Sequence, residues 1–206
     1  MAKIDIVAEQ TEFLLKKQSE VLNCFKDGFG SLKEFLKAEQ EKAEKVNAGP
    51  ELQSFQNVYA LIEEEEKESV GQISEDVEFL KEQIAAIKEI QKMEDEEQAN
   101  QITEMMLEGG HELMETEKFK KDVEAESNEA QESFKSMVED VKAVFEEDGI
   151  KELEMLLQAH VEERRQDEKA MEKISREAEE DEEEGKCEAS CSSCKGCDIF
   201  EGVREE

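Results

Sequence analysis

Large aromatic side chains, prolines and positive charges are all scarce in this chain of 206 residues. It has no Trp, one Tyr and one Pro, and its 58 acidic side chains outnumber its 26 basic ones. A compact globule of this length needs more large apolar side chains, because their burial has to offset the conformational entropy of the chain. The composition therefore leaves two classes: long helices that bury a narrow apolar stripe, or a disordered chain.

The shortage of positive charge limits the partners of the protein. Its formal net charge is -32, whereas nucleic acids and anionic lipids are bound through Lys and Arg. We therefore expect no nucleic-acid partner. Basic proteins and polyvalent cations are compatible with this charge as partners. The charge is also explained by solubility alone, or by adaptation to a cell interior of high salt concentration. No apolar run reaches the roughly 20 residues that span a bilayer, so no membrane span is expected.

The start of the sequence gives no indication of a signal peptide, so none is expected. The first residues, MAKIDIVAEQTEFLLKKQ, lack a continuous apolar core and become amphipathic at once, so they are expected to begin the first helix. This pattern favours a cytoplasmic protein. Thiols stay reduced in the cytoplasm, so clustered cysteines there indicate metal or redox chemistry rather than structural disulfides.

Apolar residues recur at spacings of three and four along most of the chain, which predicts helices rather than strands or disorder. Gly-Pro, Gly-Gly and Asp-Gly pairs interrupt the pattern. The predicted helices are 3–46, 51–107, 111–147 and 150–178. Their short connections and narrow stripes predict an all-α, elongated antiparallel helical bundle or coiled coil over residues 1–175, closed within one chain or with a second copy.

The apolar stripes have two irregular points. In the first helix, Asp27-Gly28-Phe29-Gly30-Ser31 predicts a kink or a short break, because each glycine costs roughly 1 kcal/mol of helix stability. In the second helix, the spacing shifts near Glu63–Glu66 in the manner of a coiled-coil stutter. The first stripe runs through Ile4, Val7, Thr11, Leu14, Gln18, Val21, Phe25, Gly28, Leu32 and Phe35. The last one runs through Ile150, Leu153, Leu157, His160, Arg164, Met171 and Ile174.

The C-terminal part of the chain has a different composition. Residues 176–185 are almost all acidic and predict a flexible, solvated linker, followed by a cysteine-rich tail over 186–206. The tail contains Cys187, Cys191, Cys194 and Cys197. Thiolates three and four residues apart can converge on one soft metal, so these cysteines are candidate ligands of Zn²⁺ or an iron–sulfur cluster, with several Cu(I) ions as the alternative.

Other kinds of chemistry find less support. The spacing of Cys187, Cys191 and Cys194 resembles that of radical-SAM enzymes, whose βα barrel this chain lacks. A di-iron site would need two Glu-x-x-His pairs, and only Glu108 and His111 have that spacing. Nucleophile and phosphate-binding motifs are absent from the sequence.

These observations favour a non-enzymatic coiled-coil interaction protein with a four-cysteine metal-binding tail. Its expected partners are proteins bound through the helical stripes, including a second copy of itself, and basic proteins. Two alternatives stay open: a redox or metal-delivery protein that uses the tail thiols, and an acidic chaperone for basic proteins. Reversible S-acylation of the tail is a further interpretation, although its flank is acidic rather than basic.

Overall fold

The structure of the chain is a computed structural model that describes residues 3–45, 49–93, 96–107 and 115–190. These residues form five helices: α1 (Lys3–Lys45), α2 (Gly49–Ile90), α3 (Glu96–Leu107), α4 (Thr116–Asp148) and α5 (Ile150–Ser190). No strand occurs within these ranges. The predicted all-α class is therefore confirmed for the described part of the chain.

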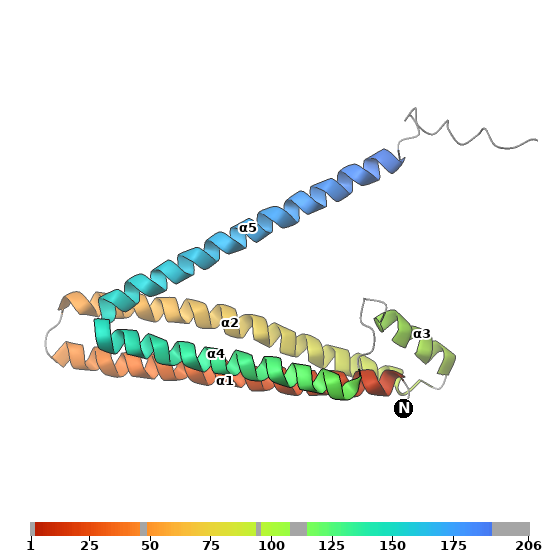
Figure 1. Ribbon diagram of the computed structural model, residues 1–206, viewed down its shortest axis with the longest axis horizontal. Helices are drawn as coiled ribbons and strands as arrows, with labels where there is room; N and C mark the ends of the chain where they lie inside the picture. Colours follow the sequence, from red (N-terminus) through yellow and green to blue (C-terminus); the bar gives the residue numbers. More distant parts are fainter. Residues whose placement is uncertain (1–2, 46–48, 94–95, 108–114, 191–206) are drawn as a thin grey trace, which may run out of the picture. The chain divides into compact units, whose positions relative to one another are not determined.

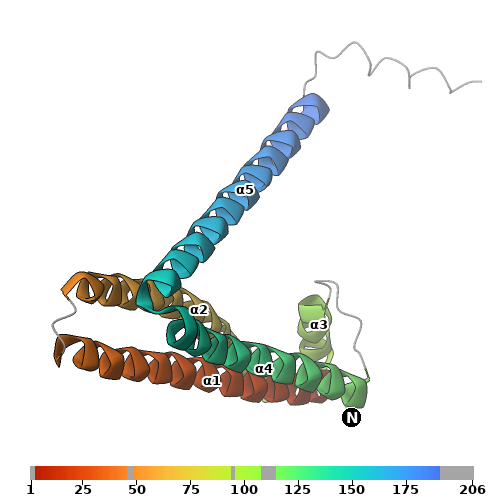
Figure 2. The same cartoon turned by 60° about the vertical axis from the view of Figure 1, so that its left-hand side comes forward.

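The chain divides into two compact units, Met1–Gln158 and Ala159–Glu206. The first unit contains α1 to α4 and the first turns of α5, and the second contains the rest of α5. Within the first unit, Figure 1 and Figure 2 show α2 and α4 lying alongside α1. The short helix α3 contacts α1 and α2, and Lys3 near the start of α1 pairs with Glu104 of α3 at 3.0 Å.

Ion pairs show the direction of α2. Lys33 of α1 lies 2.6 Å from Glu66 of α2, whereas Lys88, near the end of α2, lies 3.6 Å from Glu12, near the start of α1. The two helices are therefore antiparallel, as the short connection between them predicts.

The third long helix, α4, runs in the same direction as α1. Lys17 in the first half of α1 lies 3.1 Å from Glu124 in the first half of α4. Further along both helices, the rings of Phe35 and Phe145 meet edge to face at a centroid distance of 5.3 Å. The three long helices therefore run up, down and up.

The hydrophobic core lies where the second half of α1, the first half of α2, the second half of α4 and the start of α5 meet. Its buried members are Phe29, Leu32, Leu36, Phe55, Val58, Ile62, Phe134, Val138, Ile150 and Leu153. The apolar stripes predict several of these positions, because residues at spacings of three and four share one face of a helix. A second group of buried residues continues along α2 as Val77, Leu80, Ile84, Ile87 and Ile90.

Helix α1 buries a wider face than its predicted stripe. That stripe passes through Gly28 and Phe35, yet Phe29 and Leu36, one position further on, are only 3% and 1% exposed. The reason is that α1 contacts both α2 and α4. A helix covered on two sides buries apolar residues over a broader arc than a helix with one partner.

The predicted break at Gly28 does not occur, because α1 is continuous from Lys3 to Lys45. The ring of Phe134 stacks on Phe25 at 3.9 Å between centroids and packs at a tilt against Phe29. A Cβ atom at Gly28 would overlap Cε1 of Phe134, whereas a Cβ at Gly30 would meet nothing within 4 Å. The predicted short break is therefore wrong, and Gly28 serves the close approach of α4 to α1.

Two helix boundaries also differ from the predicted ones. The predicted helix 51–107 is two helices, since α2 ends at Ile90, the last of its buried apolar residues. In the turn that follows, the amide of Met93 donates a hydrogen bond to the carbonyl of Ile90 at 3.1 Å. Helix α4 ends at Asp148, close to the predicted end at 147, and is followed by Gly149, whose φ of 84° suits glycine. Helix α5 continues to Ser190, through the predicted linker 176–185. Glu and Ala are both strong helix formers, which favours this continuation.

The two glycines of α1 should respond in opposite ways to alanine. Gly28→Ala should lower the free energy of unfolding by about 1 to 2 kcal/mol, because the new methyl group displaces the buried Phe134 ring. Gly30→Ala should raise it by about 0.5 to 1 kcal/mol through helix propensity alone. Urea unfolding followed by circular dichroism measures both values, and Gly71→Ala in α2, which also has open space at its Cβ position, is the matched control. Equal effects at Gly28 and Gly30 would contradict the packing described here.

Candidate functional site

An ion pair fills the irregular point in the stripe of α2. After Ile62 the next position facing α1 is Glu66, and the stripe resumes at Val70. The Glu66 carboxylate accepts a hydrogen bond from Lys33 Nζ at 2.6 Å, and the two side chains are 25% and 26% exposed. The shifted spacing thus places a carboxylate between two helices, and a lysine from α1 neutralises it.

The contact raises the pKa of Lys33. The main cause is the hydrogen bond to Glu66, and burial opposes it in part. A raised pKa means that the folded state binds this proton more tightly than the unfolded state. The pair therefore stabilises the fold fully below the ordinary lysine pKa of 10.5, and its contribution disappears as the pH rises through the folded value.

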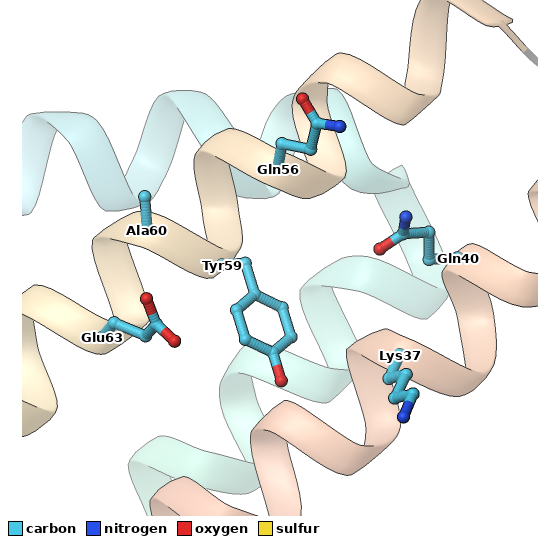
Figure 3. Close-up of a pocket in the computed structure, with 6 residues that line it drawn as sticks. All are labelled: Lys37, Gln40, Gln56, Tyr59, Ala60 and Glu63. Atoms are coloured by element: carbon cyan, nitrogen blue, oxygen red, sulfur yellow. The ribbon is translucent and has the colours of Figure 1, made fainter.

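A hollow open to solvent lies beside this ion pair, in the surface between α1 and α2. It has a volume of about 460 Å³ and is shown in Figure 3. Helix α1 lines it with Lys37 and Gln40, and α2 lines it with Gln56, Tyr59, Ala60 and Glu63. Figure 3 shows the Tyr59 ring reaching from α2 toward α1 between the amide and charged groups. The lining offers hydrogen-bond donors and acceptors and one charge of each sign, but no thiol, imidazole or aliphatic hydroxyl group for nucleophilic chemistry.

A polar layer with a structural role joins α1 to α4. The Phe13 ring lies between two ammonium groups, with Lys17 Nζ at 5.8 Å and Lys120 Nζ at 5.9 Å from its centroid. Lys17 donates to Glu124 at 3.1 Å, and Lys120 donates to Glu9 at 2.5 Å. These hydrogen bonds are the main reason why the pKa values of both lysines are raised. The layer holds the two helices in register through cation–π contacts and ion pairs.

A carboxylate attaches the first turns of α5 to α2. Glu154 Oε1 accepts hydrogen bonds from Asn57 Nδ2 at 2.6 Å and from Gln158 Nε2 at 3.2 Å. The pKa of Glu154 is lowered from its ordinary value, first by the Ser54 hydroxyl and then by Asn57. The ionised carboxylate is thus the form that the folded protein prefers.

The cysteines fall partly outside the described residues. Cys187 lies on the backbone of α5 near its end, but its side chain is not described, and Cys191, Cys194 and Cys197 lie outside the described ranges. Cys24 of α1 is half-buried, as its place between Leu22 and Phe25 predicts, and its Sγ lies 4.0 Å from the carbonyl oxygen of Gln131. Across the described part of the chain, no three or more His, Cys, Asp or Glu side chains are grouped so that they could hold a metal ion.

The two histidines lie in different circumstances. His160 is exposed on α5, whereas Glu108 and His111 lie outside the described residues, so the di-iron spacing stays untested. In the run Glu63–Glu66, two of the carboxylates have different surroundings. Glu63 lines the open hollow, and Glu66 pairs across the helix interface.

Sequence periodicity did not single out the residues of the hollow, apart from Tyr59, which stands on the stripe of α2. The ion pair had one signal, the shifted spacing near Glu66, but the position of its lysine on the neighbouring helix required the structure. Among the described residues, no helix combines the length and the apolar composition needed to cross a bilayer. Comparison of the chain with protein-family models, curated proteins and solved structures finds no match.

Removing one member of the Lys33–Glu66 pair should cost more than removing both. Lys33→Met leaves a partly buried carboxylate without its lysine and should destabilise the bundle by about 1 kcal/mol. The double variant Lys33→Met/Glu66→Leu should recover that loss, because an apolar pair suits the stripe. Chemical unfolding measures the values, and Lys37→Met, an exposed lysine one turn further along, should change stability by less than about 0.5 kcal/mol. A double variant less stable than Lys33→Met would contradict the assignment.

Stability should depend on Glu154 in a defined pH range. Because its pKa is lowered in the folded state, its contribution is present above the ordinary value of 4.5 and is lost as the pH falls through the folded value. Thermal melting of the wild type and of Glu154→Gln should differ at pH 7 and converge below about pH 4. Comparing the two proteins at each pH removes the general effect of protonating the other carboxylates. A melting difference that stays constant down to pH 3 would contradict this role.

Proposed function

We propose that the protein is a non-enzymatic interaction protein, in which a helical bundle presents an acidic surface and α5 leads to a four-cysteine metal-binding tail. The observation that supports this proposal is the place of the perturbed titratable groups. The pKa values of Lys17, Lys33, Lys120 and Glu154 are shifted by contacts that join one helix to another. Such shifts serve helix packing, whereas shifts that serve catalysis gather in a cleft around a reactive group.

The acidic surface suits protein partners rich in basic residues. The chain has a net charge of -32, and the Lys33 and Lys120 side chains are largely covered at helix interfaces, at 26% and 28% exposed. Carboxylates therefore dominate the solvent-facing sides of the helices. Electrostatic attraction to a basic protein would act mainly through the association rate and would weaken as salt is added.

The cysteine tail is the proposed metal site. Cys187, Cys191, Cys194 and Cys197 provide four thiolates, a complete ligand set for Zn²⁺ or for an iron–sulfur cluster, and Cu(I) is the alternative. Helix α5 continues to Ser190, so Cys187 belongs to its last turn. In the sequence, the tail thus comes more than thirty residues after Leu153, the last buried member of the bundle core.

Metal analysis of protein purified without oxygen tests the proposal. We expect Zn or Cu by elemental analysis, or a brown iron–sulfur absorption, in the wild type. Replacing Cys187, Cys191, Cys194 and Cys197 by Ser should abolish the bound metal and leave the helix content and melting temperature unchanged. Cys24→Ser is the matched control and should keep the metal, because this thiol is half-buried between α1 and α4.

Two results would contradict the metal proposal. The first is reduced protein that is free of metal and binds neither added Zn²⁺ nor Cu(I). The second is equal metal content in the wild type and the four-serine variant. If the metal-free thiols instead form and exchange disulfides under mild oxidation, as thiol titration would show, the redox interpretation replaces the metal proposal.

A further inference from the structure

One phenylalanine of α2 faces solvent. Phe79 is 59% exposed, whereas the other phenylalanines of the described chain are buried or half-buried. Its neighbours Val77 and Leu80 are buried, at 4% and 9% exposed. Because two residues turn an α-helix through about 200°, Phe79 lies on the side of α2 opposite Val77. The packing of the bundle therefore does not account for this ring.

Carboxylates surround the Phe79 ring. Glu75 and Asp76 lie one helical turn before it and Glu82 lies one turn after it, on the same face of α2, and all three are exposed. A phenylalanine side chain in a helix leans toward the preceding turn, which here carries two of these carboxylates. Residues 68–80 contain no Lys or Arg. The face thus combines an exposed aromatic ring with a local excess of negative charge.

We propose that this face of α2, formed by Glu75, Asp76, Phe79 and Glu82, is a docking surface for arginine side chains of a basic protein. The inference rests on the proposed function, which supplies the basic partner, and it assigns that partner to one face of the bundle. A guanidinium group stacks flat on the ring while its N–H groups donate to the neighbouring carboxylates. Arginine fits this face better than lysine, because its planar group stacks on aromatic rings and is more weakly hydrated.

The charges of the face disfavour other occupants. The same face of a second copy would bring carboxylates against carboxylates, and an apolar helix would bury the three carboxylates without partners. Nucleic acids and anionic lipids carry the same sign of charge as the face. Lys81, the nearest lysine in the sequence, already pairs with Glu78 at 2.5 Å. A cationic side chain from another protein is therefore the complement of this face.

A single arginine on this face should bind weakly. Exposed cation–π contacts and surface ion pairs each contribute little, and salt screens them further. Neighbouring arginines that contact the ring and the carboxylates together should bind more strongly than one. A short peptide of adjacent arginines is therefore a suitable probe.

Nuclear magnetic resonance of the full chain tests the surface, with acetyl-tetra-arginine amide as the probe in about 0.1 M salt. When the phenylalanine rings carry a ¹³C label, the signal of Phe79 is the one that disappears in Phe79→Leu. We expect this signal to shift more than those of the other phenylalanines, and the side-chain protons of the probe to move upfield, as protons above an aromatic ring do. Acetyl-tetra-lysine amide has the same charge and should bind at least about twofold more weakly.

Two variants separate the ring from the charge. Phe79→Leu keeps the net charge and an apolar side chain, and it should weaken the binding of tetra-arginine about threefold, as measured from the backbone amide signals of the face. Glu75→Gln/Asp76→Asn should weaken binding by a similar factor. The matched control is Glu129→Gln/Glu132→Gln, which removes the same charge from exposed positions of α4 and should leave binding at α2 within about 1.5-fold.

Three results would overturn the docking surface: signal shifts spread evenly over the acidic helices, unchanged binding by Phe79→Leu, and equal weakening by the substitutions on α2 and on α4. Each of them leaves the proposed acidic-surface function standing. Failure of tetra-arginine to bind even at about 0.02 M salt would overturn the basic partner as well. Circular dichroism of each variant verifies that the helix content is unchanged, as expected for substitutions at exposed positions.

Discussion

The first unit depends on the packing of α1 against α2 and α4 at the same time. Phe29, Leu32 and Leu36 of α1 belong to a core that also includes residues of α2, α4 and the start of α5. Since helices of this composition bury little apolar surface each, a central helix with two covered sides is what makes a common core possible. The close approach of α4 uses Gly28, where the Phe134 ring occupies the space that a side chain would take. A glycine that costs helix propensity is thus retained because it serves tertiary packing.

The acidic composition makes the placement of each lysine important. Among the described residues, ion pairs connect α1 to its neighbouring helices at Lys3–Glu104, Lys17–Glu124, Lys33–Glu66, Lys88–Glu12 and Lys120–Glu9. Surface pairs contribute little individually, but these also neutralise carboxylates at the places where helices meet. The scarce cations therefore reduce repulsion inside the bundle, and the excess negative charge faces solvent. The same distribution limits the repulsion between neighbouring helices in a chain of net charge -32.

The proposed metal chemistry belongs to the cysteine tail rather than to the bundle. The bundle's polar clusters have structural explanations, because they join helices and their pKa shifts arise from that role.

Periodicity alone predicts the helical class, most of the core residues of α2, and helix ends close to Lys45, Leu107 and Asp148. Helix faces and stop signals are local properties of a chain, so its sequence shows them. The predicted stripe of α1 was narrower than the face that the helix buries, and the predicted break at Gly28 does not occur. The segment predicted as one helix forms α2 and α3. Each of these errors has the same physical source. Whether Phe29 is buried, or a glycine is packed rather than bent, depends on a second and third helix whose positions local spacing does not contain. The hollow beside Tyr59 and the pairing of Glu66 with Lys33 likewise form only when α1 packs against α2. The four tail cysteines can be identified from the sequence alone, because their spacing is a local property of the chain.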